Sequence, residues 1–491
     1  MPKDIMLFAS TDSITTWDPS AAYSTESSYM PNIYETLIWV SPPGSDKLFQ
    51  PGLAVSWRVE DNGLKWTFNL RKGVKFHDGG MLTAQVVKDS IERTMKMKKG
   101  AAFIFDPVKE VKVVNDYVVQ FILKYAAPFG RIIASANAAW IISPNAVEKD
   151  RAWFDAGREA GCGPYVLEKW KPDEEIIFKK FDDYWRGWEG PHFDRIIVKI
   201  TKEATVALQM LEGAVADLAT RIPAESINDF DAKECCELLR GPSFTNYYIH
   251  LNTAKFPFSN KLIRKAVSYA LSYKDLVMVA ISDRGTQAVG PIPFGQFGHD
   301  QSLLQYSQDL GKAKELMKQA GYQDGLKKKV LFTYAAENNV EKIMAPLVQE
   351  AFGKIGIDVE IRPMIWTAQW ELMKGGAEGA HDMAAVMWWP TFSDPYETLY
   401  SLWHVEKKPY WNFSYYKNPE FDKTILAAYS TPDGSKAAAL YSKASQMLIE
   451  DAASLFLFDV EWLVYKRANL KGYVINPNYP RVPFWYNMYK E

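Results

Sequence analysis

The residues best suited to contact a ligand lie in the segment Trp388–Pro395, which has the sequence Trp-Trp-Pro-Thr-Phe-Ser-Asp-Pro. It directly follows an apolar run, Met383–Met387, that is predicted to be a strand, and open α/β sheets bind ligands beyond the carboxyl ends of their strands. Trp388, Trp389 and the more distant Trp366 offer flat faces that stack on sugar rings or on the apolar faces of peptides. Packing in the core or between domains is the alternative role for one or two of them.

No segment has the spacing of a known catalytic or phosphate-binding motif. The chain lacks H-E-x-x-H, G-x-S-x-G, the P-loop and the dinucleotide motif G-x-G-x-x-G. The six histidines form no i, i+3 or i, i+4 pair, so a metal site would need ligands from distant segments. Paired carboxylates such as Asp182-Asp183 are common on protein surfaces. A glycosidase needs two carboxylates that face each other across a cleft, and the sequence alone does not exclude such a pair. We therefore expect that the protein is not an enzyme and that it binds neither a cofactor nor a metal ion.

The composition is that of an ordinary globular protein. Of 491 residues, 47% are hydrophobic and 24% are charged, which suits about three domains of roughly 100–200 residues. Aromatic residues make up 14%, with 17 tryptophans. Because a buried indole N–H needs a partner, this surplus is a mild indication of aromatic-lined clefts besides core packing. The formal net charge of −2 argues against a nucleic-acid-binding protein.

Neither cysteine pairing nor membrane insertion is predicted. The three cysteines form no C-x-x-C motif, and the adjacent Cys235 and Cys236 are poorly placed for a disulfide with each other. No apolar stretch reaches the roughly 18 residues of a membrane span. The first residues, Met1–Phe8, lack the basic and apolar regions of a signal peptide. The sequence pattern alone leaves open a cytoplasmic protein or one whose signal has been removed.

Local patterns predict a small α+β region followed by α/β units. Trp66, Phe68 and Leu70 alternate with polar residues, as in a half-buried strand, and Thr83 is a suitable N-cap for a helix. Asn115-Asp116 between two apolar runs indicates a hairpin. The predicted helices are 84–96, 204–212, 262–271, 310–320, 345–355 and 437–450. The predicted strands are 4–10, 111–114, 118–123, 165–170, 175–181, 196–200, 216–218, 247–251, 357–361, 383–387 and 455–464, and residues 33–40 are expected to run from helix into strand.

Several segments together resemble the family 5 extracellular solute-binding proteins, the dipeptide, oligopeptide and nickel receptors of ABC importers. The signature is carried in order along the chain, between about residue 30 and about residue 425. Its segments are Leu53–Trp57 (LAVSW), Trp66–Gly79 (WTFNLRKGVKFHDG), Gly161–Tyr165 (GCGPY, with Cys in place of the usual Thr), Ile263–Leu271 (IRKAVSYAL), Lys312–Leu316 with Ala320–Tyr322, Ile355–Ile357 and Asp394-Pro395.

The resemblance implies an α/β, periplasmic-binding-protein-like clamp of two lobes and three domains. Domain I would comprise residues 1–42, 161–246 and 466–491, and domain II, an appended α+β domain, residues 43–160. Domain III would comprise residues 247–465. Crossovers near Tyr247–Asn252 and near Tyr465 would form the hinge, and a ligand in the cleft would stabilise the closed state.

The resemblance also assigns a role to the position of Thr391. In peptide receptors of the family, the residue three positions before the acidic-Pro pair is an aspartate that binds the α-ammonium group of the ligand. Here that residue is Thr391, which is neutral and cannot provide a charge-assisted hydrogen bond. Asp394 belongs to the acidic-Pro element and need not face the ligand. A free amino terminus on the ligand is therefore in question.

Four further residues complete the expected ligand-binding set with Trp366, Trp388, Trp389 and Thr391. Phe392 lies in the same segment, and Tyr23 lies in the Tyr23–Thr25 loop, which corresponds to a ligand-contacting loop of the family. Cys162 occupies the matching turn of domain I, where the alternative is a small buried residue. Asn412 lies in the loop Trp411–Phe413, which the family often turns toward the cavity, and simple loop packing is its alternative.

The expected function is that of a monomeric extracytoplasmic receptor that delivers a short peptide or peptide-like ligand to the permease of an ABC importer. The periplasm or the outer face of the cytoplasmic membrane is the expected location, with the signal sequence removed. An oligosaccharide receptor of the same family is the first alternative, because of Thr391 and the tryptophans. A glycoside hydrolase and a sensor or chaperone-like surface protein are alternatives from other classes.

Overall fold

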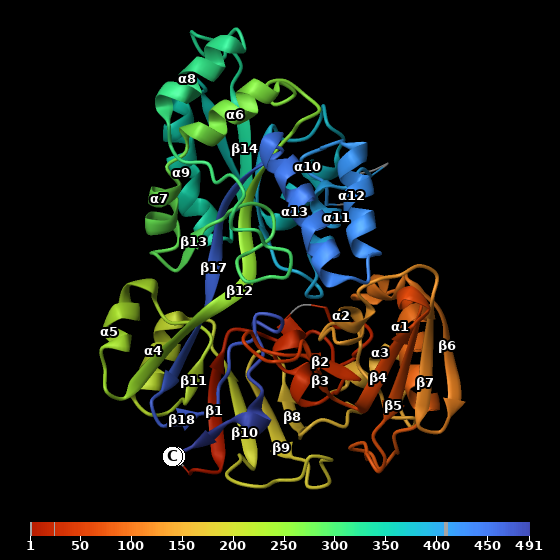
Figure 1. Ribbon diagram of the computed structural model, residues 1–491. Helices are drawn as coiled ribbons and strands as arrows, with labels where there is room; N and C mark the ends of the chain where they lie inside the picture. The colour runs from red at the N-terminus through yellow and green to blue at the C-terminus, as the bar shows by residue number, and fades with distance from the viewer. Residues whose placement is uncertain (1, 24, 407–410) are drawn as a thin grey trace. The chain divides into compact units, whose positions relative to one another are not determined.

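The computed structural model describes residues 2–23, 25–406 and 411–491 (Figure 1). The chain folds into two compact units, the first comprising Met1–Pro242 and Trp462–Glu491 and the second Ser243–Glu461. It passes between the units in two strands, β12 (Cys236–Leu251) and β17 (Ser454–Arg467). The finer division of the first unit into domains I and II, and the hinge residues, remain predictions.

The main sheet of the first unit is built around β1 (Ile5–Ser10). This strand is parallel to β10 (Arg195–Ile200) on one side and to β11 (Leu218–Ala219) on the other. The order is β17-β11-β1-β10-β9-β8, with β8 (Tyr165–Lys171) and β9 (Glu175–Lys180) antiparallel at one edge. Apolar side chains of β1, β11 and α4 (Ala204–Glu212) form a buried cluster that also holds α5 (Ile227–Asp231). These elements confirm the strands and the helix predicted here.

A second, four-stranded antiparallel sheet lies within the same unit. Its order is β4-β5-β7-β6, from β4 (Ala54–Glu60), β5 (Lys65–Leu70), β6 (Val108–Asn115) and β7 (Val118–Leu123). α1 (Ala84–Met97) packs on β6 and β7, and the Thr83 side chain accepts a hydrogen bond from the backbone N–H of Val86. The predicted N-cap and hairpin are therefore confirmed. Short elements complete the unit: β2 (Ile38–Val40), β3 (Phe49–Pro51), α2 (Phe129–Ile133), α3 (Arg151–Asp155), β18 (Leu470–Lys471) and β19 (Tyr489–Lys490).

The prediction of a helix leading into the strand at residues 33–40 is wrong in its first half. A 3-10 turn ends at Asn32, and β2 begins only at Ile38. The carbonyl groups between them bind distant partners instead of forming helical hydrogen bonds: Ile33 O accepts the N–H of Gly163 at 2.7 Å, and Thr36 O accepts that of Leu53 at 3.0 Å. Such long-range pairing leaves no signal in the local sequence.

The second unit has a sheet in the order β15-β14-β16-β12-β17, with β13 (Gly285–Gln287) paired to β17. β14 (Val330–Ala335) is parallel to β15 (Val359–Met364) and to β16 (Met383–Trp388), and β12 is antiparallel to β16. The β16 prediction is confirmed. β12 starts at Cys236 rather than Tyr247, because its first half carries polar residues, Gly241 and Pro242, which conceal a strand.

Helices pack around this sheet and enclose a large apolar core (Figure 1). α9 starts at Asn339 and not at Ala345, because the Asn338 side chain caps it and the helix continues through Pro346. α10, α11 and α12 were not predicted. The helices are α6 (Lys261–Ala270), α7 (Tyr273–Asp275), α8 (Leu310–Gln319), α9 (Asn339–Gly353), α10 (Trp366–Lys374), α11 (Pro395–Trp403), α12 (Pro419–Tyr429) and α13 (Gly434–Glu450).

Two of the sequence motifs meet in a tight buried turn of the first unit. The His77 backbone N–H donates to Gly161 O at 2.9 Å, and His77 Nε2 lies 2.9 Å from Gly163 O. His77 Nδ1 lies 2.8 Å from a carboxylate oxygen of Glu159, and both side chains are almost fully buried. Burial opposes the charged ring, but the Glu159 carboxylate and the Gly163 carbonyl outweigh it and raise the pKa of His77. The turn is thus held together by the buried hydrogen bonds of His77 with Glu159 and with the backbone of Gly161 and Gly163.

Gly161 tests how tightly this turn is packed. A Cβ atom at Gly161 would lie 1.9 Å from Ile33 O, and this backbone atom cannot move aside cheaply. We expect Gly161→Ala to destabilise the protein by about 1–3 kcal/mol. Gly353→Ala is the matched control, because it adds the same methyl group to α9 with nothing within 4 Å, and it should be neutral or slightly stabilising. Thermal unfolding of both variants checks this, and equal Tm values would contradict it.

Candidate ligand-binding site

The candidate site is built around the end of β16 in the second unit. The strand is buried from Met383 to Val386 and half-buried at Trp388, where its ladder ends. In the antiparallel register Trp388 lies opposite Asn246 of β12, and directly opposed residues place their side chains on the same face of a sheet. Trp389, the next residue, is 46% exposed. The indoles of Trp388 and Trp389 therefore lie at the carboxyl end of the buried strand, where the chain leaves the core.

Four tryptophans from three chain segments gather here, which we call the tryptophan cluster: Trp366, Trp370, Trp388 and Trp411. Trp411 is the common partner of the other three. It stacks on Trp366 at a centroid distance of 6.3 Å and an interplanar angle of 13°, and it meets Trp388 edge-on at 5.3 Å. All four rings are half-buried and pack against buried Met373, Ala384, Val386 and Phe413. The structure therefore brings Trp366 and Trp388 into one cluster. Residues that contact the same ligand must lie close together, and these two predicted site residues meet that condition.

α10 explains how two of the rings share one face. Trp366 and Trp370 are four residues apart, so both point to the same side of the helix. The Lys374 ammonium group lies 3.6 Å from the centre of the Trp370 ring, one turn further on, which adds a cation–π contact. Trp370 was not predicted as a site residue, although its spacing from Trp366 would have indicated a shared face once a helix was assigned.

A buried carboxyl group, Glu397, lies beneath Trp388 in the first turn of α11. Its two oxygens accept hydrogen bonds from Trp388 Nε1 and from Thr391 Oγ1, each at 3.2 Å. Only 4% of Glu397 is exposed. Burial raises its pKa from 4.5 to about 7, against the opposing effect of the hydrogen bonds from Trp388 and Thr391. The carboxyl group therefore fixes both predicted site residues, and nothing in the local sequence distinguished it from a surface glutamate.

The rest of the segment 388–395 serves mainly to begin α11. Thr391 is 6% exposed and Phe392 is also 6% exposed, so each has little surface for a ligand in this state. Asp394 caps α11 by accepting the N–H of Tyr396, and it also accepts the Tyr441 hydroxyl at 2.6 Å. Asp394 is therefore engaged by protein partners, which agrees with the expectation that it need not face a ligand.

Asn412 is fully engaged within its own loop. Its amide nitrogen donates to His404 O at 2.9 Å and to Tyr416 O at 3.0 Å, and its side-chain oxygen accepts the Ser414 hydroxyl at 2.8 Å. Only 3% of the residue is exposed. These contacts support the loop-packing role, in which Asn412 holds its neighbour Trp411 in place.

Two of the predicted site residues, Tyr23 and Cys162, belong to the first unit. Tyr23 is 46% exposed, and its ring meets that of Phe103 edge-on at 6.3 Å. Ser24 in the same predicted loop lies outside the described residues. Cys162 is fully buried between Gly161 and Gly163, and burial raises the pKa of its thiol far above the ordinary value. This environment suits the packing role of Cys162.

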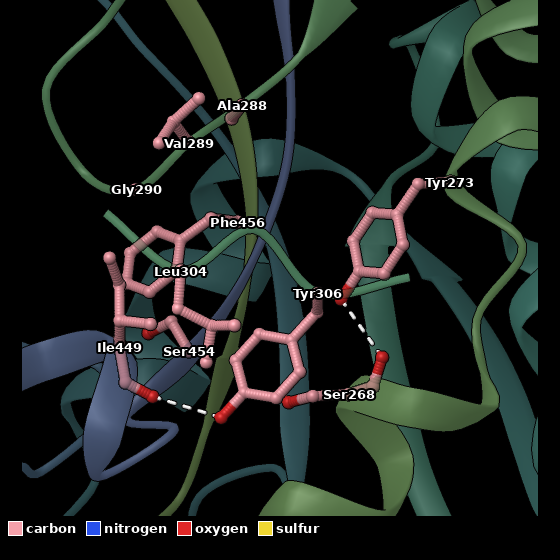
Figure 2. A pocket seen from close by; sticks show the side chains of 10 residues that line it. All are labelled: Ser268, Tyr273, Ala288, Val289, Gly290, Leu304, Tyr306, Ile449, Ser454 and Phe456. Carbon is pink, nitrogen blue, oxygen red and sulfur yellow. Dashed lines mark hydrogen bonds between the residues drawn. The ribbon is translucent and has the colours of Figure 1, made fainter. Parts of the chain in front are cut away.

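An internal cavity of the second unit is too small to be the ligand site. Figure 2 shows it between the rings of Tyr273, Tyr306 and Phe456. Tyr306 donates its hydroxyl to Ile449 O and Tyr273 to Ser268 O, each at 3.1 Å. The space suits about one water molecule. Peptides and sugars need far more room.

Neither a metal cluster nor a membrane helix is found in the described part of the chain. There, no three His, Cys, Asp or Glu side chains are grouped so that they could hold a metal ion. Likewise, none of the helices over residues 2–23, 25–406 and 411–491 combines the length and the apolar character needed to cross a bilayer.

Known proteins resemble this chain over nearly its whole length. A probable D,D-dipeptide-binding periplasmic protein of Escherichia coli is 29% identical over 489 residues, which cover 97% of this chain and 92% of that protein. A glutathione-binding protein of Salmonella choleraesuis is 30% identical over 487 residues, covering 97% and 93%. The solved structure of an ABC transporter-associated periplasmic binding protein from Helicobacter pylori, in complex with the peptide STSA, has a TM-score of 0.82 at 27% identity and covers 99% of this chain and 98% of that one.

The fold is thus that of the periplasmic solute-binding proteins, in agreement with the α/β class expected from the sequence. The sequence profile of the bacterial extracellular solute-binding proteins, family 5 Middle, matches residues 49–410. The chain belongs to this family.

Glu397 predicts a pH dependence that is specific to the site. In the unfolded chain its carboxyl group ionises near pH 4.5, whereas in the folded chain it keeps its proton up to about pH 7. Between these values, rising pH therefore favours unfolding, here by roughly 1–3 kcal/mol. Glu397→Gln removes this contribution, so the Tm of the variant minus that of the wild type should increase from about pH 5 to about pH 8. A constant difference across this range would show that Glu397 does not titrate as described.

Proposed function

We propose that this protein is an extracytoplasmic receptor that captures short peptides or peptide-like ligands and passes them, chemically unchanged, to the permease of an ABC importer. The observation that carries the proposal is the tryptophan cluster at the carboxyl end of β16, in a chain that aligns over 97% of its length with two peptide-binding relatives. Both the dipeptide and glutathione that name these relatives are short and peptide-like, as is the peptide bound to the Helicobacter pylori protein.

The chemistry of the site agrees with such ligands. The half-buried rings of Trp388 and Trp366 provide apolar faces for side chains and for the flat peptide group. Thr391 offers no charge, and its hydroxyl is directed to Glu397. Residues other than Thr391 must therefore bind the charged ends of any ligand that carries them.

The remaining parts of the proposal follow from family membership. The receptor works as a monomer outside the cytoplasmic membrane. Ligand binding closes a hinge at the two chain crossings, in β12 and β17. The ligand supplies the differential affinity that stabilises the closed state. An oligosaccharide receptor with the same architecture would use the same tryptophans for stacking, and ligand screening separates the two.

Ligand screening by thermal shift is the first test. We expect peptides such as D-alanyl-D-alanine, glutathione or the tetrapeptide Ser-Thr-Ser-Ala to raise the Tm, because a ligand at about 100 times its Kd stabilises the native state by about 2.7 kcal/mol. Affinity for a charged peptide should weaken with added salt, whereas affinity for a neutral sugar should not. Stabilisation by oligosaccharides alone would replace the peptide proposal, and turnover of any ligand would contradict a receptor role.

Trp388→Ala tests the placement of the site. Loss of this stacking surface should weaken binding of the peptide identified in the screen by about 1–3 kcal/mol. Isothermal titration calorimetry measures the affinity, and circular dichroism confirms the fold. Trp57→Ala is the control: this partly exposed tryptophan lies in β4 of the other sheet of the first unit, so its removal should leave affinity unchanged. Equal affinity of wild type and Trp388→Ala would show that the site lies elsewhere.

A further inference from the structure

Two buried polar side chains, on the neighbouring strands β12 and β17, have oxygen atoms that no described residue satisfies. Asn246 lies opposite Trp388 in the β12–β16 ladder, and Asp459 lies on β17, the neighbour of β12 on its other side. Asn246 is 1% exposed and Asp459 is 8% exposed. Their Oδ1 atoms are both buried, and neither has a hydrogen-bond partner among the residues that the structure describes.

The remaining polar atoms of these two side chains are held by one loop, residues 291–299. Asp459 Oδ2 accepts the backbone N–H of Phe294 at 2.8 Å, and the Asn246 amide donates to Pro291 O at 3.3 Å. Tyr248 also donates to Pro291 O, at 2.7 Å. Gln296 of the same loop is 3% exposed, and both polar atoms of its amide are without a partner within the described chain. The loop therefore fixes the two side chains and leaves one oxygen of each unused.

The unused oxygens define the chemistry of a missing partner. A buried acceptor without a hydrogen bond costs about 1–3 kcal/mol, so native proteins rarely leave one unpaired. Burial raises the pKa of Asp459 to about 7, although the Phe294 N–H, His299 and the Asn246 amide oppose this effect. No lysine or arginine is paired with Asp459 in the described residues. A carboxylate and an amide oxygen side by side accept hydrogen bonds from a group that carries donors only, and an ammonium group carries three.

We propose that Asp459, together with Asn246, binds the ammonium group of a peptide-like ligand whose apolar part stacks on Trp388. Asp459 then supplies the negative charge that Thr391 lacks, from a neighbouring strand. This inference rests on the proposed function and deepens it, since it assigns a cationic end to the ligand and places that end over β12 and β17. Ordered water in place of the ammonium group is the competing occupant.

The test compares free and N-acetylated peptides on matched variants. Wild-type protein is incubated with an equimolar synthetic library of di- to pentapeptides and, separately, with the same library after N-acetylation. Native mass spectrometry identifies the bound peptides, and calorimetry on the best binder and its acetylated form gives the affinities. Asp459→Asn removes the charge at constant shape, and Asp358→Asn removes an exposed charge of the same unit, whose side chain is 60% exposed.

We expect N-acetylation to weaken binding to the wild type at least about tenfold, because the buried carboxylate then loses its charged partner. Asp459→Asn should weaken binding of the free peptide to a similar extent, whereas Asp358→Asn should not. The fold should survive, because Asn resembles the protonated form of a carboxyl group that burial already favours. Near pH 6, binding of the free peptide should release a proton from Asp459 in the wild type and none in Asp459→Asn, measured by calorimetry in buffers of different ionisation enthalpy.

The possible failures are distinguishable. If peptides bind but neither N-acetylation nor Asp459→Asn changes the affinity, the inference is overturned, water satisfies the two oxygens, and the proposed function stands. If the wild type binds no member of either library while oligosaccharides stabilise it, the proposed function falls and the inference falls with it. Should Asp459→Asn fail to fold, the comparison of free and acetylated peptides on the wild type decides alone.

Discussion

The pairing of β12 with β16 is the constraint on which the candidate site depends. β16 is buried along most of its length between β14 and β12, so its register cannot shift without moving Met383 and Ala385 out of the core. This register sets Trp388 opposite Asn246. The strand ends there, and the chain can turn its next indole into solvent and begin α11 only a few residues later. The backbone hydrogen bonds between β12 and β16 thus place the stacking surface of Trp388 and the buried amide of Asn246 next to each other.

Two buried carboxyl groups, Glu397 on α11 and Asp459 on β17, differ in their hydrogen bonds and therefore in their roles. Both pKa values are raised to about 7 by burial. In Glu397 each oxygen already accepts a side-chain hydrogen bond, so it holds Trp388 and Thr391 in position. In Asp459 one oxygen accepts a backbone N–H and the other has no partner in the described chain. The satisfied carboxyl group stabilises the site, and the half-satisfied one is the group able to interact with a ligand.

The sequence predicted the elements that local patterns encode. The alternation in β5, the Thr83 cap of α1 and the apolar run of β16 all correspond to the structure. Long-range contacts escaped prediction: Glu397 looked like any glutamate near a helix start, and Asp459 lay in a run predicted only as a strand. The number of tryptophans also does not show which of them are buried. Trp403 is fully buried and donates a hydrogen bond to Ser454, whereas Trp411 is half-buried. Burial is a property of the whole fold, and it decides which of these residues can meet a ligand.

The segments that reveal the family are not those that determine the ligand. His77, Gly161 and Gly163 belong to the recognisable motifs, and they lock a turn in which even one added methyl group would collide with Ile33. Such a constraint acts on the fold whatever the ligand is. The position of Thr391 departs from the family pattern, and two buried carboxyl groups lie on other elements, Glu397 on α11 and Asp459 on β17. The residues of the tryptophan cluster lie outside this turn, so a change of ligand specificity in such a receptor need not disturb the packing that the turn requires.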